Sequence, residues 1–164
     1  MKELLEKLSS YNIFNYLLPG IVFVVLAEEF TTFRFVQQDI ILGVFMYYFI
    51  GLVISRIGSV VIEPILKWSR FIHFATYADF LSASKEDKSL EVLSEANNMY
   101  RTFCSLFVIL IFVKIYERLL IIAPIIRQLA AGFLILGLLT LFLFSYRKQT
   151  QYITKRIQGI KKGD

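Results

Sequence analysis

The chain has 164 residues, of which 57% are hydrophobic, with a mean hydropathy of +0.62 and a net charge of +5. Soluble domains average about 45–50% apolar residues, so one small soluble core cannot hide this much apolar surface. Cys104 is the only cysteine, which excludes an intramolecular disulfide, a thiolate metal cluster and a thiol oxidoreductase. We therefore expect an all-α polytopic membrane protein with four helices of about 20 residues each.

Four apolar segments separated by charged residues are the predicted transmembrane helices. They cover residues 11–30, 40–62, 102–122 and 123–146 of a single domain. The stretch 1–10 is charged and amphipathic, and no small-residue cleavage pattern follows the apolar run from Ile13, so the first segment is expected to remain in the mature protein. Pro19 removes a backbone amide within this segment, which predicts a kink there.

Small residues line one ridge of the second segment, at Gly51, Ser55 and Ser59. Small side chains let helix backbones approach closely in lipid, so the ridge predicts a helix contact. That contact lies either within the chain or between the subunits of a homo-oligomer. Arg56 is beside the ridge and either snorkels to the headgroups or pairs with an acid such as Glu63 or Glu95.

Residues 63–101 form the predicted cytoplasmic loop, which is helical in character. Pro64 can occupy the first position of a helix. The Ser84 to Asp87 spacing predicts a capping box, followed by a long helix that continues into the third segment.

The same loop contains the residues that we expect to contact a partner. The aromatic run around Trp68 and Arg70 predicts a surface covered by headgroups on one side and by protein on the other. Asn97 and Asn98 are poor helix formers just ahead of the third segment. They either cap and bond neighbouring helices or bind a ligand or partner.

Charged residues cluster in the outer half of the third segment. Lys114, Glu117 and Arg118 are three or four residues apart and share one helix face. Together with Arg127 they either line a pore or polar cavity, or lie in the outer membrane interface.

The basic tail, residues 147–164, is expected to continue the fourth helix, with Ile153 and Ile157 on one face for partner or subunit contact. Most lysines and arginines lie in the N-terminus, the loop and this tail. Cationic segments are retained in the cytoplasm, so we expect a multi-pass protein of the bacterial inner (plasma) membrane with both termini inside. Anionic headgroups account for the basic tail, and no nucleic-acid partner is expected.

Sequence patterns of enzymes are missing. His73, the only histidine, has no companion at metal-ligand spacing, and the sequence contains no nucleophile elbow and no phosphate loop. We expect no catalysis, no metal and no cofactor. The chain is expected to be an oligomeric membrane subunit, a sensor or anchor that docks a cytosolic protein. The alternative is a pore-forming or membrane-perturbing effector, such as an ion channel.

Two runs of residues resemble motifs of a protein group. The run Tyr11–Gly20 and the stretch from Tyr77-Ala-Asp-Phe80 to Asn97-Asn-Met-Tyr-Arg101 are similar to those of small bacterial four-helix membrane proteins found in phage-defence systems. The resemblance spans most of the chain and implies a role in antiviral defence. It assigns no chemistry to any residue.

Overall fold

The computed structural model describes residues 13–161, and all regular elements in this part of the chain are helices. In chain order they are η1 (Ile13–Leu17), α2 (Leu18–Phe30), α3 (Ile40–Ile57), η2 (Gly58–Ile62), α4 (Glu63–Trp68), α5 (Tyr77–Glu86), α6 (Ser89–Ile122) and α7 (Ile126–Lys161). The predicted all-α class is confirmed. The charged stretch 1–10 and the last tail residues lie outside the described residues.

Two helices are long and apolar enough to cross a bilayer. They are Ile40–Trp68, which joins α3, η2 and α4, and Ile126–Gly159 within α7. Of the most apolar 18 residues in each, only 22% and 11% are buried, so neither helix is the enclosed core of a soluble fold. α2 has 13 residues, which span about 20 Å, less than a hydrocarbon core of about 30 Å. The structure thus supports a membrane protein, and four crossings remain a proposal.

The packed core lies between α2, α3 and α6, and its fully buried apolar residues are Phe23, Val24, Ala27, Ile54 and Leu106. Two glycines bring α2 and α3 into backbone contact. A Cβ on Gly20 would collide with the Tyr47 carbonyl oxygen, and one on Gly51 would collide with the Tyr16 carbonyl oxygen. This close approach requires glycine at both positions.

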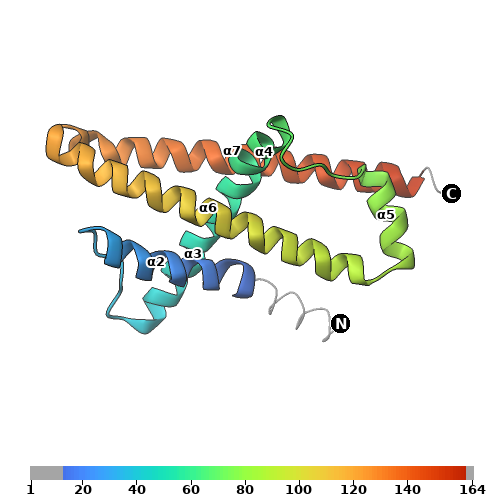
Figure 1. The fold of residues 1–164 in the computed structure, drawn as a ribbon, viewed down its shortest axis with the longest axis horizontal. Helices are drawn as coiled ribbons and strands as arrows, with labels where there is room; N and C mark the ends of the chain where they lie inside the picture. The colour runs from blue at the N-terminus through green and yellow to red at the C-terminus, as the bar shows by residue number, and fades with distance from the viewer. Residues whose placement is uncertain (1–12, 162–164) are drawn as a thin grey trace.

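Figure 1 shows α6 and α7 side by side along the long axis of the molecule, while α3 runs obliquely across them. α5 bridges the start of α6 and the end of α7. Its Tyr77 ring lies 6.2 Å from the Tyr152 ring of α7, and Leu81 Cδ2 would be 3.2 Å from a Cβ placed on Gly159. The two longest helices are therefore braced at one end.

One predicted helix boundary was right only in part, and another was wrong. α4 begins at Glu63 with Pro64 in its first turn, as predicted, but η2 joins it to α3 as one continuous helix. Ser84 lies inside α5, and α6 begins at Ser89 instead, where the Asp87 carboxylate accepts hydrogen bonds from the Ser89 amide and hydroxyl at 2.8 Å each. The long helix that continues into the third segment is confirmed as α6.

Pro19 has the effect expected of a proline near the start of a helix. It lies in the first turn of α2, and the preceding turn, η1, is π-helical. A proline inside a helix removes a hydrogen bond and disturbs the turn before it. The predicted irregularity is therefore present, immediately before α2.

Candidate functional site

Glu63 is the most enclosed carboxylate in the described chain, at 4% exposure. It lies where the π-helical turn η2 meets α4. Burial of a carboxylate is unfavourable unless cations and hydrogen-bond donors compensate it. The buried Glu63 carboxylate therefore depends on the cations around it.

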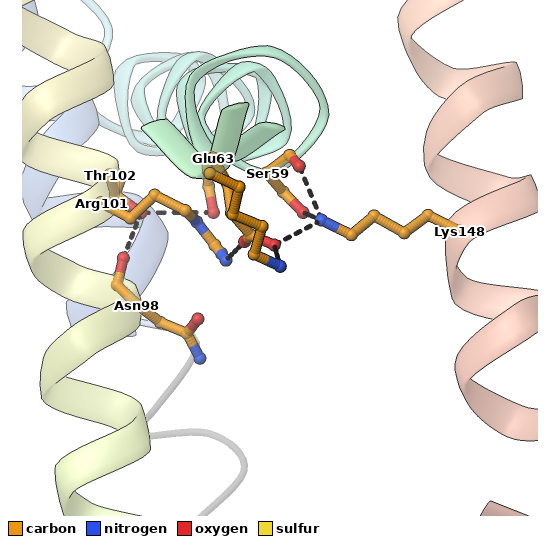
Figure 2. Close-up of polar contacts among 8 residues, drawn as sticks. Ser59, Glu63, Asn98, Arg101, Thr102 and Lys148 are labelled. Carbon is orange, nitrogen blue, oxygen red and sulfur yellow. Dashed lines mark hydrogen bonds and ion pairs between the residues drawn. The ribbon is translucent and has the colours of Figure 1, made fainter. Parts of the chain in front are cut away.

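Three cations converge on Glu63 from three helices. Lys67 Nζ lies 2.9 Å from Oε1, Arg101 Nη1 lies 2.7 Å from Oε2, and Lys148 Nζ lies 3.2 Å from Oε1. Figure 2 shows Arg101 of α6 and Lys148 of α7 reaching toward Glu63 from opposite sides. With Ser59 these residues form what we call the Glu63 cluster: Ser59, Glu63, Lys67, Arg101 and Lys148.

Pro64 explains why Lys148 binds here. In a π-helical turn each amide donates to the carbonyl five residues earlier, and the Glu63 amide accordingly donates to the Gly58 carbonyl. The Ser59 carbonyl would need the amide of residue 64, and proline has none. Lys148 Nζ supplies the missing donor, at 2.6 Å from the Ser59 carbonyl oxygen and 2.9 Å from Ser59 Oγ.

The approach of α6 is equally local in origin. A Cβ placed on Gly58 would lie only 3.2 Å from the Arg101 carbonyl oxygen, so glycine lets η2 lie directly on α6. One turn earlier, Ser105 Oγ donates to the Ile54 carbonyl at 2.9 Å. Thr102 Oγ1 lies 3.4 Å from Ser55 Oγ. Small polar residues thus position the Arg101 side chain beside Glu63.

The Glu63 cluster has more positive than negative charge. Glu63 is the one acidic partner that the described residues provide for the three cations, which leaves a formal charge of +2. Lys148 uses all three ammonium donors on Glu63 and Ser59. Lys67 donates one hydrogen bond to Glu63, and Arg101 Nε is buried without a hydrogen-bond partner in the described structure. Lys67 and Arg101 therefore retain donor capacity.

A second polar group lies at the other end of the bundle. Lys114 Nζ is 2.6 Å from Glu117 Oε2 and 2.7 Å from the Phe30 carbonyl oxygen. Glu117 Oε1 accepts a hydrogen bond from the Thr32 amide at 2.6 Å. These bonds fasten the loop after α2 to α6. An open hollow of about 450 Å³ beside them is also lined by Arg118.

The predicted oligomer ridge packs inside the chain instead. Gly51 contacts the Tyr16 backbone, and Ser55 and Ser59 are buried against α6 and Lys148. These residues are therefore unavailable to another subunit, which corrects the intersubunit alternative. The intrachain alternative was right, because backbone contact between α2 and α3 needs small residues.

Among residues 13–161 Arg56 pairs with no acid, contrary to one of the two alternatives. Its Nη2 donates to the Tyr16 hydroxyl at 2.9 Å, while Glu63 is occupied by other cations. Arg127 is exposed and is separate from the residues that line the hollow. The charged set predicted near a pore is therefore only partly brought together.

The predicted partner residues are mostly exposed. Trp68 is 87% exposed, and Arg70 is exposed in a turn with a positive φ of 59°. Ile153 and Ile157 are each about half exposed. Asn97 is exposed, whereas the Asn98 carbonyl accepts a hydrogen bond from Thr102 Oγ1 at 2.9 Å. Within residues 13–161, Trp68 and Phe71 of the aromatic run are left without protein cover.

Sequence reasoning named Glu63 only as a partner for Arg56 and did not single out Arg101 or Lys148. One signal was available, because Glu63 is the only acid between Asp39 and Asp79 and directly precedes a proline. Among residues 13–161 no three histidine, cysteine or acidic side chains gather as a metal site. The chain matches no protein-family model, no curated protein and no solved structure.

Proposed function

We propose that this chain is a non-catalytic subunit of the bacterial inner membrane that crosses the bilayer four times and docks a cytosolic protein. The convergence of three predicted membrane boundaries supports this topology. Glu63, Arg101 and Lys148 each lie within two residues of a predicted boundary, and they meet in one cluster. Three independent positions meet at a single level, which fits the cytoplasmic face of a bilayer.

Helix length is the observation that carries the docking function. α6 has 34 residues and α7 has 36, so each is about 50 Å long. A hydrocarbon core of about 30 Å leaves about 20 Å of each helix outside it. The first half of α6 and the last part of α7 project from the same end, because the helices run antiparallel through a short turn.

The projecting ends form a braced frame, which we define as α5, residues 89–101 of α6 and residues 147–159 of α7. Apolar side chains remain exposed on it, namely Val92, Leu93, Tyr100, Ile153 and Ile157. In water such a surface is unfavourable, and contiguous exposed apolar patches mark interaction sites. A cytosolic protein that covers these residues is the occupant that we propose.

Site-specific photocrosslinking in intact cells tests this proposal. A photoreactive residue at Leu93, which is 61% exposed, should form an adduct with a second protein. The same residue at Phe133 in the apolar part of α7, 69% exposed, should react with lipid or with another copy of the chain. Absence of any protein adduct at Leu93, with the chain inserted and folded, would contradict the docking function.

Paired double variants separate apolar docking from charge. Ile153→Asp with Ile157→Asp should remove the adduct, because both residues lie on the exposed face of the frame. Lys155→Gln with Arg156→Gln changes two exposed residues of the same helix and should leave the adduct intact. Equal losses would show that charge, rather than apolar contact, governs docking.

The subunits are proposed to form a homo-oligomer through α7, where Gly132 and Gly137 have no other residue within 4 Å of an added Cβ. The apolar face around them meets lipid or another copy. The proposed setting, antiviral defence, follows the sequence resemblance. A phage challenge of cells that carry each double variant tests this setting. Ile153→Asp with Ile157→Asp should lose protection, and Lys155→Gln with Arg156→Gln should retain it.

A pore is the second candidate, and the hollow beside Arg118 is the observation that favours it. Lys114 and Glu117 are used within the chain, where they hold the loop after α2. Only the exposed Arg118 and Arg127 would then face a conduction path. Ion flux into liposomes that contain the purified chain tests the pore. Flux that is lost in Arg118→Gln and kept in Arg156→Gln would support the pore over the anchor.

A further inference from the structure

We propose that the Glu63 cluster binds a phosphate group, and that the source is the headgroup of an anionic lipid in the cytoplasmic leaflet. The proposal starts from the charge of the cluster. Three cations face one carboxylate, so the cluster retains a formal charge of +2 beside the membrane. A phosphodiester carries the single negative charge and the acceptor oxygens that such a site lacks.

The available donors point to Lys67 and Arg101 as the ligand-binding residues. Lys148 is already saturated by Glu63 and Ser59. Lys67 is 44% exposed in its side chain and has ammonium donors that no protein acceptor takes in the described structure. Arg101 is 22% exposed in its side chain, and its guanidinium can bind phosphate through two parallel hydrogen bonds.

The surroundings of Lys67 match the headgroup region of a bilayer. Its ammonium group lies 4.2 Å from the centre of the Phe74 ring, which holds it beside an aromatic surface. Trp68 is 87% exposed and Phe71 is 79% exposed at the same end of the α3–α4 helix. Tryptophan and other aromatic residues are favoured at the membrane interface, where basic pockets bind anionic headgroups.

The turn after α4 adds another cation at this level. Arg70 has a positive φ of 59°, and its amide donates to the Lys67 carbonyl at 3.1 Å. This turn ends the helix and leaves Arg70 exposed next to Trp68. Arg70 thus adds an exposed cation three residues after Lys67.

The position of Trp68 makes the test direct, because it is the only tryptophan and is adjacent to Lys67. The full chain is purified in zwitterionic detergent at constant ionic strength, and Trp68 emission is followed. The probes are short-chain phosphatidylglycerol, phosphatidylcholine of the same chain length, and inorganic phosphate. Saturable change with phosphatidylglycerol alone supports the lipid source, and saturation by phosphate instead assigns a soluble phosphate to the same residues.

Matched variants separate a built site from general surface charge. Each interfacial cation contributes about fivefold, so Lys67→Gln with Arg101→Gln should weaken phosphatidylglycerol binding about 30-fold. Lys155→Gln with Arg156→Gln removes the same charges from exposed positions of α7 and should keep the affinity within about twofold. If the double variant misfolds, Lys67→Gln alone replaces it, because Lys67 is exposed. This single variant should bind phosphatidylglycerol about fivefold more weakly than the unchanged chain.

Glu63→Gln should have the opposite effect. It removes the carboxylate that competes with phosphate for Lys67 and Arg101, so binding should become about fivefold tighter. Three results would overturn the proposal: equal responses to phosphatidylglycerol and phosphatidylcholine, equal losses in the two double variants, or no saturable response to any probe. This test uses the purified chain without a partner, so loss of the Leu93 adduct in cells would leave its result unaffected.

Discussion

Replacement of Glu63 by glutamine should destabilise the folded bundle more than any other single charge change in the described chain. The side chain keeps its size, but Arg101 and Lys148 lose the buried carboxylate that compensates them. The Lys67 pair is half exposed and within one helix, so it contributes only about 0.3–0.5 kcal/mol. Breaking a buried ion pair costs about 3–5 kcal/mol. Arg101 and Lys148 keep some solvent access, so we expect about 3 kcal/mol.

Unfolding of the purified chain by sodium dodecyl sulfate in mixed micelles measures this free energy. Glu95→Gln is the matched control, because Glu95 is exposed on α6 and takes part in none of the four described ion pairs. It should change the free energy of unfolding by less than about 0.5 kcal/mol.

A double-variant cycle then tests whether Glu63 acts through Lys148. Glu63→Gln with Lys148→Met should cost at least about 1 kcal/mol less than the sum of the single variants, because the two side chains contact each other. Additive costs, or equal losses in Glu63→Gln and Glu95→Gln, would refute the cluster as the tie between α4 and α7.

Three further predictions follow from single contacts. Pro64→Ala supplies the amide that the Ser59 carbonyl lacks. Lys148→Met should therefore lower the free energy of unfolding less in a Pro64→Ala chain than in the unchanged chain, as measured by the same unfolding assay. Gly51→Ala should destabilise the chain by about 1–3 kcal/mol, because its Cβ would collide with the Tyr16 carbonyl. Gly43→Ala in the same helix places its Cβ at ordinary contact distance, 3.4 Å from the nearest atom, and should stabilise α3 by about 0.5–1 kcal/mol; equal effects would contradict the packing. The Ser89 hydroxyl and amide hold the pKa of Asp87 below its ordinary value, so the start of α6 should lose stability as pH falls through that lowered pKa. The loss should appear as smaller hydrogen-exchange protection factors in the first turn of α6, and Asp87→Asn should abolish this pH dependence.

The helices themselves could be predicted from the sequence, because uncharged apolar runs and 3.6-residue periodicity are local properties. α6 and α7 were predicted in this way, including the extension of α6 ahead of the third apolar segment. The start of α4 at Glu63 was predicted, but its continuity with α3 was not, because a proline that begins a separate helix and one that follows a π-helical turn give the same sequence signal. Only the hydrogen bonds of η2 distinguish the two cases.

The pairing in the Glu63 cluster could not be predicted in the same way. Arg101 is 38 residues from Glu63 and Lys148 is 85 residues away, so their meeting depends on how three helices pack. Arg56 is nearer to Glu63 in sequence, and one of the two alternatives for Arg56 paired it with an acid such as Glu63 or Glu95. The packing of η1 on α3 gives Arg56 the Tyr16 hydroxyl instead. Sequence separation therefore favoured the wrong cation.

The position of the Glu63 cluster links the two proposals physically. Arg101 and Lys148 belong to helices that continue past the cluster, into the apolar segments on one side and into the docking frame on the other. A partner that moved the projecting end of α6 relative to α7 would change the distances from Glu63 to both cations, because long helices transmit displacement along their axes. Phosphate competes with Glu63 for the same donors, so a bound headgroup would weaken the ion pairs from Glu63 to Arg101 and Lys148. Coupling between two sites is reciprocal, so a partner whose docking strengthens these ion pairs would weaken headgroup binding.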